Sequence, residues 1–136
     1  MTLTDAGPLI ALINRNDPNH GTCVTALLGL PSGPLVTTWP CFTEAMYLLF
    51  RAGGFPAQRE LWRLVADGRL VLHELSSTAA VRSAELMEKY RDRPMDLADA
   101  TLVALAESIS IDDVFTLDRD FQIYRLASGE ALRIIP

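Results

Sequence analysis

Four acidic residues stand where short apolar segments meet helices, and they are the residues of this sequence best suited to chemistry: Asp5, Glu44, Asp99 and Asp118. Carboxylates that gather in one place must be neutralised by protons or by cations. A site made only of oxygen ligands suits Mg²⁺ or Mn²⁺, and these ions commonly serve phosphoryl chemistry. If the fold brings the four acids together, we therefore expect a divalent-cation site that acts on phosphate esters.

Asp96 and Asp99 lie three residues apart at the start of the apolar segment Pro94–Glu107, which follows a helical period. Side chains at this spacing are neighbours on one face of a helix. A helix N-terminus favours negative charge, so the segment by itself favours capping, with Asp96 as the N-cap and Asp99 as an acid of the first turn. Capping and cation binding are two interpretations of the same pair, and the positions of the other acids bear on the choice.

Short apolar segments alternate with helical patterns along the chain. The expected strands are Met1–Thr4, Leu35–Thr38, Leu70–Leu75, Val114–Leu117 and Ala131–Ile135. The expected helices are 8–13, His20–Leu30, Cys41–Arg51, Pro56–Asp67, 77–90 and 97–108, with a short helical turn between Asp118 and Tyr124. This alternation predicts an α/β domain with a mainly parallel sheet, helices on both faces and right-handed crossovers.

All four acids, with Asp96 beside them, are expected on one edge of this sheet. In a parallel sheet, the ends of the strands and the beginnings of the following helices share an edge. Asp5 and Asp118 follow the first and fourth strands, and Glu44 lies in the first turn of the helix after the second strand. The helix that carries Asp99 runs back toward the fourth strand, so it begins at the same edge. Each acid alone is explained as a cap or a turn residue, but their joint placement favours a shared site.

The composition fits a single domain covering residues 1–136, with 49% hydrophobic and 21% charged residues. No apolar run is long enough for a membrane span, and no leader pattern opens the chain. Cys23 and Cys41 form no disulfide framework, which indicates buried thiols in a reducing compartment such as the cytoplasm. The net charge of −5 argues against a broad basic surface for nucleic acid. If divalent cations neutralise four clustered carboxylates, however, the net charge of the rest of the chain is only −1.

Four motifs match a known family: TDAGPLIALIN with Asp5, FTEAMYLL with Glu44, LADATLVALAE with Asp99 and TLDRDF with Asp118. Their order and spacing, over nearly the whole chain, resemble those of PIN-domain ribonucleases, specifically the VapC-like toxins of bacterial and archaeal toxin–antitoxin modules. The resemblance implies a PIN-like fold with a five-stranded parallel sheet flanked by helices. It also implies an acidic pocket in which the same four residues bind Mg²⁺ or Mn²⁺ and catalyse endonucleolytic cleavage of RNA.

The resemblance also implies roles for residues around the four acids. Asp96 and Asp120 are supporting acids, and Thr116 matches a small hydroxyl residue that orients a carboxylate. Arg93 and Arg119 flank the expected pocket in the sequence and are candidates for guiding the RNA backbone. As partners the family implies the RNA substrate, a small antitoxin protein encoded separately and frequently a second copy in a homodimer, with no membrane.

Other functions remain open at this stage. An RNA-processing PIN nuclease outside a toxin–antitoxin module, a metal-dependent 5′-nuclease acting on DNA and a non-catalytic PIN-like interaction domain would all fit an α/β chain of this kind. Interaction domains usually lose one or more acids, whereas all four are present here. A phosphoacceptor signalling domain would require paired acids after the first strand and a lysine after the last. Here Asp5 stands alone, and the only lysine, Lys89, lies in an expected helix.

Overall fold

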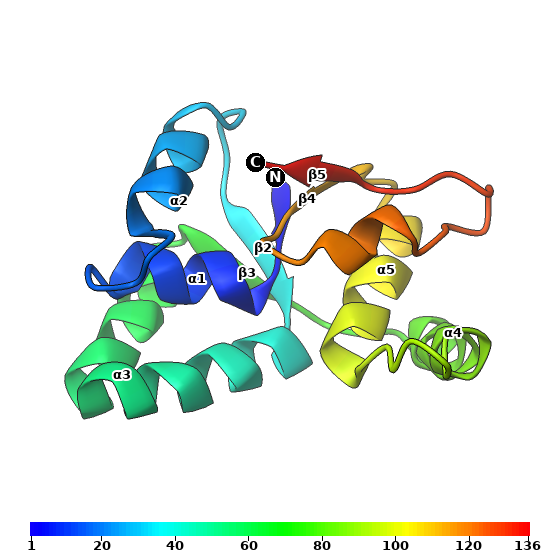
Figure 1. The fold of residues 1–136 in the computed structure, drawn as a ribbon, viewed down its shortest axis with the longest axis horizontal. Helices are drawn as coiled ribbons and strands as arrows, with labels where there is room; N and C mark the ends of the chain where they lie inside the picture. Colours follow the sequence, from blue (N-terminus) through cyan, green and yellow to red (C-terminus); the bar gives the residue numbers. More distant parts are fainter.

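The computed structural model describes residues 1–136 and contains one sheet of five parallel strands in the order β3-β2-β1-β4-β5 (Figure 1). The strands are β1 (Thr2–Thr4), β2 (Leu35–Thr38), β3 (Leu70–His73), β4 (Asp113–Phe115) and β5 (Arg133–Ile135). In the central strand, Leu3 pairs with Val36 of β2 on one side and with Val114 of β4 on the other. All three side chains are fully buried, as is usual for parallel strands covered on both faces. The prediction of a parallel five-stranded sheet is confirmed.

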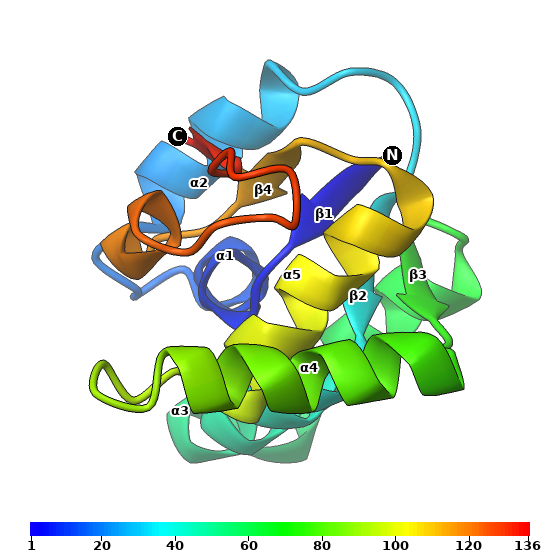
Figure 2. The ribbon, with the colours of Figure 1, turned by 90° about the vertical axis from the view of Figure 1, so that its right-hand side faces the viewer.

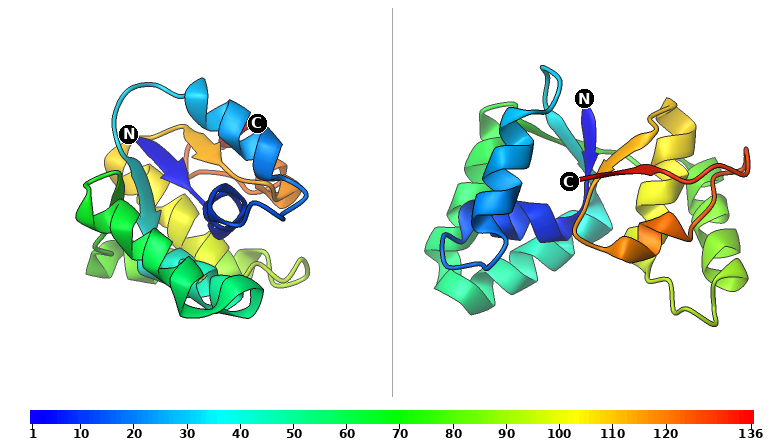
Figure 3. Two further views of the ribbon diagram at one scale, coloured as in Figure 1. Left: turned by 90° about the vertical axis from the view of Figure 1, so that its left-hand side faces the viewer. Right: turned by 45° about the horizontal axis from the view of Figure 1, so that its top comes forward.

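Helices cover both faces of the sheet, and a short 3₁₀ helix follows β4. The elements are α1 (Ala6–Ile13), α2 (His20–Leu28), α3 (Trp39–Ala66), α4 (Ser77–Lys89), α5 (Leu97–Ile109) and the 3₁₀ helix η1 (Arg119–Gln122). α1, α2 and α3 lie on one face, and α4 and α5 lie on the other (Figures 1 and 3). Each face has its own apolar core: Leu9, Phe42 and Phe115 belong to one, and Leu102 and Phe121 to the other.

α5 is the most deeply buried helix. Every residue from Ala98 to Ala106 is buried, because one side of the helix faces the sheet and α4 covers the other (Figure 2). Four of these nine residues are alanines, and their small side chains allow close approach on both sides. Asp99, in the first turn of the helix, is one of these buried residues.

α3 contains the break that the sequence predicted between two helices. Gly54 has φ 67° and ψ −160°, a conformation outside the helical region, and Pro56 follows it. The expected gap of four residues is absent, because the two helical segments meet directly at this kink. The helix also begins earlier than expected, at Trp39, because the Thr38 side chain caps it and Pro40 is accommodated in its first turn. Glu44 therefore lies in the second turn of α3, which corrects its expected place in the first.

The ends of several elements differ from the expected ones by two residues. β3 ends at His73 instead of Leu75, β4 at Phe115 instead of Leu117 and α2 at Leu28 instead of Leu30, while β5 begins at Arg133 instead of Ala131. At β4 the cause is visible. The Thr116 amide makes the last ladder contact, to the Ile135 carbonyl, and the Thr116 hydroxyl then accepts from the Asp118 amide, which turns the chain out of the sheet. None of the helices is both long and apolar enough to cross a membrane.

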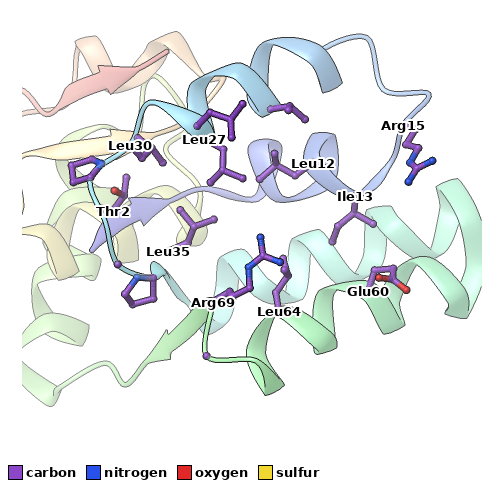
Figure 4. A pocket seen from close by; sticks show the side chains of 16 residues that line it. Thr2, Leu12, Ile13, Arg15, Leu27, Leu30, Leu35, Glu60, Leu64 and Arg69 are labelled. Atoms are coloured by element: carbon purple, nitrogen blue, oxygen red, sulfur yellow. The ribbon is translucent and has the colours of Figure 1, made fainter.

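A large cavity of about 860 Å³ opens at the edge of the sheet where β1, β2 and β3 begin (Figure 4). It lies between α1, α2 and the second half of α3. Leucines from all three helices line it, and the charged side chains among its walls are those of Arg15, Glu60 and Arg69. This groove is at the opposite edge of the sheet from the carboxyl ends of the strands.

Candidate active site

Five acidic residues line one cavity of about 290 Å³ at the carboxyl edge of the sheet. The acids are Asp5, Glu44, Asp96, Asp99 and Asp118, and Ala6, Gly7 and Leu117 complete the lining. Asp5 follows β1, Glu44 is on α3, Asp96 and Asp99 begin α5, and Asp118 follows β4. The expected convergence on one edge is therefore observed, and no histidine, cysteine or hydroxyl side chain lines the cavity.

Three of the five acids are also N-caps. The Oδ1 atom of Asp5 accepts from the Ala6 amide at 2.7 Å, that of Asp96 from the Asp99 amide at 2.8 Å, and that of Asp118 from the Asp120 amide at 2.9 Å. These caps begin α1, α5 and η1. The capping interpretation of Asp96 is thus correct, and it does not compete with a shared site. The helices begin at the pocket because the acids cap them there, and the N-terminal ends of α1 and α5 offset part of the pocket's negative charge.

Asp5 is the most firmly held of the acids. Its side chain is 8% exposed, and its Oδ2 atom accepts a hydrogen bond from the Thr116 hydroxyl at 2.8 Å. The same hydroxyl accepts from the Asp118 amide at 3.0 Å, so Thr116 connects the acids that follow β1 and β4. Burial raises the pKa of Asp5, and the hydrogen bonds from Thr116 and the Ala6 amide oppose that rise. The contact expected for Thr116 is present.

Asp99 has the most perturbed carboxyl group. It lies in the first turn of α5, is 8% exposed, and accepts at Oδ2 from the Tyr124 hydroxyl at 3.4 Å. Burial, followed by the charges of Asp96, Asp5 and Asp118, raises its pKa to about 8. Without a cation, Asp99 therefore holds a proton at neutral pH, which relieves part of the repulsion in the pocket.

Glu44 approaches the pocket from the other face of the sheet. Its side chain is exposed and accepts no hydrogen bond, which leaves it free to rotate. Partial desolvation by the pocket walls, and then the charge of Asp5, raises its pKa. Of the five acids, Glu44 is thus the one best able to move toward a bound ion.

The donor set fits a hydrated divalent cation. All donors are carboxylate oxygens, and the Oδ2 atoms of Asp96 and Asp118, like the carboxylate of Glu44, accept no hydrogen bond from the protein. No three acids are already placed as ligands around one point, so binding requires side chains such as Glu44 to rotate inward. Mg²⁺ commonly retains several waters and uses only one or two carboxylates, which suits this wider arrangement.

Three residues expected near the site lie outside the cavity lining. Asp120 is directed toward Arg93, with 3.9 Å between Oδ1 and Nη1, and this pair links the α4–α5 turn to η1. Arg119 is exposed and makes no ion pair. Asp120 is therefore placed to pair with Arg93 and does not line the pocket. Arg93 and Arg119 both lie beside the acidic edge.

Two buried residues near the acids were not predicted to belong to the site. Cys41 Sγ lies 3.9 Å from Asp5 Oδ1 and 3.6 Å from the Ala98 carbonyl oxygen, and it was expected only as a buried thiol. Tyr124 contacts Asp99 across 25 residues of sequence. No local pattern signals either contact, because each joins residues that are far apart in the sequence.

Comparisons with known proteins agree with this fold. The family model for the PIN domain matches residues 2–126. Ribonuclease VapC26 of Mycobacterium tuberculosis is 27% identical over 135 residues, covering 98% of this chain and 99% of that protein. The crystal structure of VapC20, a sarcin-ricin loop cleaving toxin of the same organism, matches with a TM-score of 0.84 and 19% identity over 100% of both chains. VapBC2 of Rickettsia felis, bound to a DNA fragment from its promoter, matches with a TM-score of 0.72 and 13% identity over 99% of this chain and 98% of that one. Because the family model spans most of the sequence and the fold agrees, this chain belongs to the PIN-domain family.

Proposed function

We propose that this protein is a metal-dependent endoribonuclease and the toxin of a toxin–antitoxin pair. The observation that carries the proposal is the cavity lined by five acids from both helical layers, with no side chain suited to covalent catalysis among them. Such a pocket favours hydrolysis by an activated water over a covalent intermediate. Support for RNA as the substrate comes from the relatives, which include a ribonuclease and a sarcin-ricin loop cleaving toxin.

In the proposed reaction, Asp5, Glu44, Asp99 and Asp118 would hold one or two Mg²⁺ or Mn²⁺ ions, directly or through bound water, and Asp96 would support them at the rim. Such an ion would lower the pKa of a water molecule and offset charge on the phosphate. Asp99 or Asp118 would accept the proton of that water, and its attack in line with the leaving oxygen would cut the phosphodiester. Thr116 holds the Asp5 carboxylate and the Asp118 backbone in fixed relative positions through its two hydrogen bonds.

Arg93 and Arg119 are proposed to contact the RNA backbone. Both are exposed beside the acidic edge, and Arg93 is held there by Asp120. An acidic pocket repels a polyanion, so cations at its border are needed to bring the phosphates close before a metal ion neutralises the acids.

The test compares two aspartates that make the same local hydrogen bond. Asp118 accepts from the Asp120 amide in the pocket, and Asp17 accepts from the Asn19 amide in the α1–α2 turn, away from it. Purified protein should cleave single-stranded RNA with Mn²⁺ and not with EDTA. Asp118→Asn should lower the cleavage rate at least a hundredfold, while Asp17→Asn keeps the wild-type rate, with native circular dichroism in both. Equal cleavage by the two variants would reject the assigned site.

A protein partner is the second part of the proposal. The relatives of known structure include toxin–antitoxin complexes from Klebsiella pneumoniae and Haemophilus influenzae. The groove between α1, α2 and α3 offers an apolar cavity of about 860 Å³, and two arginines against one glutamate in its walls favour a partner segment with acidic flanks. We therefore assign this groove to an amphipathic segment of the antitoxin.

Expression of the chain alone should arrest growth of a bacterial host, and co-expression with the adjacent small protein should relieve the arrest. Leu27→Glu in the groove should abolish co-purification of that protein, whereas Val81→Glu, at an exposed position on α4, should not. A ribonuclease that is harmless on expression and has no co-purifying partner would instead be an RNA-processing enzyme.

A homodimer is proposed through the outer face of α3. Trp39, Tyr47 and Phe50 are 44%, 62% and 59% exposed there, and they lie on one side of the helix at spacings of three to eight residues. A second copy would bury this aromatic strip. Phe50→Glu should shift the molecular mass in light scattering from a dimer to a monomer, and a wild-type monomer would reject this part of the proposal.

A further inference from the structure

Tyr124 is an enclosed aromatic residue whose hydroxyl reaches the acidic pocket. The residue is 2% exposed, and its ring packs edge-on against Tyr90 and Phe121 at centroid distances of 5.1 and 5.4 Å. Its hydroxyl has one hydrogen-bond partner, Asp99 Oδ2, at 3.4 Å. A buried hydroxyl without a partner is costly, so Tyr124 and Asp99 each restrict where the other can lie.

We propose that Tyr124 is a positioning residue for Asp99, a role that rests on the proposed metal-dependent function. The Tyr124 hydroxyl fixes Oδ2 on the side of η1 and leaves the other carboxylate oxygen for the pocket. Asp99 then presents one oxygen to an incoming cation in a fixed orientation, instead of sampling several rotamers. The proposal adds Tyr124 to Thr116 as a hydroxyl donor that orients a pocket acid: Thr116 donates to Asp5, and Tyr124 donates to Asp99.

The surroundings of Tyr124 explain why its hydroxyl is a rigid donor. The ring of the neighbouring Tyr90 packs edge-on against the Tyr124 ring, and this packing does not involve the Tyr90 hydroxyl, which accepts a hydrogen bond from the Arg125 amide at 2.9 Å. Arg93 and Asp120, 3.9 Å apart, link the α4–α5 turn to η1 as well. The α4–α5 turn and the η1 segment therefore hold the Tyr124 ring between them, and its hydroxyl cannot leave Asp99 without disturbing both.

Groups that orient metal ligands from outside the ligand set typically change metal affinity or activity by 10- to 100-fold when they are removed. The hydrogen bond here is long for an O–H donor, so we expect an effect at the lower end of that range. The effect should be on metal affinity and turnover, because Tyr124 is buried and does not reach a bound RNA chain.

The test uses two tyrosines that are neighbours in space. Tyr124→Phe removes the hydroxyl at Asp99 and keeps the packed ring. Tyr90→Phe is the matched control, because it removes the adjacent hydroxyl, which bonds to a backbone amide and not to an acid. By isothermal titration, Mn²⁺ affinity should fall about tenfold in Tyr124→Phe and stay within about twofold of wild type in Tyr90→Phe. In cleavage assays at subsaturating Mn²⁺, kcat should fall in Tyr124→Phe while KM for RNA is unchanged.

Asp99→Asn separates the failure of this inference from the failure of the proposed function. If Asp99→Asn binds Mn²⁺ like the wild type, the metal site itself is wrongly assigned. If Asp99→Asn loses Mn²⁺ affinity and Tyr124→Phe retains it, only the role of Tyr124 is overturned. An equal loss in Tyr124→Phe and Tyr90→Phe also overturns it, since that result reports general loosening of the aromatic cluster. The double variant Asp99→Asn/Tyr124→Phe should bind no more weakly than Asp99→Asn alone.

Discussion

At the scale of single residues, Asp5, Asp96 and Asp118 each use one carboxylate for two purposes. One oxygen caps a helix, and this bond sets the position of the side chain, while the same residue also lines the pocket. Local sequence patterns reveal the cap because it involves neighbouring residues. They do not reveal the pocket, because it depends on acids that are 22 to 113 residues apart. The sequence left open whether these acids cap helices or form a shared site, and in the structure they do both.

The raised pKa of Asp99 predicts a specific dependence of stability on pH. An ordinary aspartate in the unfolded chain has a pKa of about 3.9, whereas burial and neighbouring acids raise that of folded Asp99 to about 8. Between these values the folded state binds the extra proton, so the metal-free protein loses stability as the pH rises toward 8. Asp99→Asn lacks this titration. In thermal melts with EDTA, the melting temperature of the wild type should fall progressively below that of Asp99→Asn as the pH rises from 5 to 8. A difference in melting temperature that is constant across this range would contradict the assigned pKa.

Thr116 provides the second prediction at this scale. Thr116→Val keeps the shape of the side chain but leaves Asp5 Oδ2 and the Asp118 amide without their partner. The free energy of unfolding should fall by about 1–3 kcal/mol, and Mn²⁺ affinity should fall as well. Thr116→Ser retains the hydroxyl and should keep both properties near wild type. Urea denaturation and calorimetric titration measure the two effects, and equal behaviour of the Val and Ser variants would rule out the hydroxyl bridge.

At the scale of elements, the sequence predicts the order and type of nearly every helix and strand, and errs at their ends. The pattern of apolar residues in the α5 segment is strong enough to locate the helix and its N-cap in the sequence. Glu44 was placed in the wrong turn, because the start of α3 depends on the Thr38 cap and not on the apolar period. Asp120 was expected as a supporting acid from the resemblance, and its carboxylate lies outside the cavity lining, 3.9 Å from Arg93. Contacts between elements that are distant in the sequence, such as Tyr124 with Asp99, leave no periodic signal at all.

The kink of α3 can be tested with two glycines. Gly54 has φ 67° and ψ −160°, a region that is essentially accessible only to glycine. Gly54→Ala should therefore lower the free energy of unfolding by about 1–3 kcal/mol. Gly21, in α2, has no atom within 4 Å of the position that a Cβ would occupy, so Gly21→Ala should raise stability by about 0.5–1 kcal/mol. Chemical denaturation should show a lower free energy of unfolding for Gly54→Ala and a higher one for Gly21→Ala. A Gly54→Ala variant more stable than the wild type would contradict the positive φ of Gly54 at the kink.

At the scale of the whole molecule, the sheet separates two surfaces with different properties. The carboxyl edge carries the acidic cavity, and the opposite edge carries the apolar groove. Much of the net charge of −5 is accounted for by the five pocket acids, so the negative charge of the chain reflects one site more than its general surface. The position of the acidic edge follows from topology and was predictable, since any parallel α/β sheet gathers strand ends there. The groove was not predictable, because it results from the angle between α2 and the second half of α3.

The most direct measurement of the central claim is the thermal melt of wild type and Asp99→Asn, each with and without Mn²⁺ at pH 8. For a dissociation constant of about 1 mM and about 10 mM Mn²⁺, binding should stabilise the wild type by about 1.4 kcal/mol, a rise of roughly 5 °C for a domain of this size. Asp99→Asn removes a repelling charge, so it should melt at or above the metal-free wild type and gain little from Mn²⁺. If the acids were only helix caps, Asp99→Asn would melt clearly below the wild type and Mn²⁺ would change neither protein, and that result would contradict a metal site at the carboxyl edge.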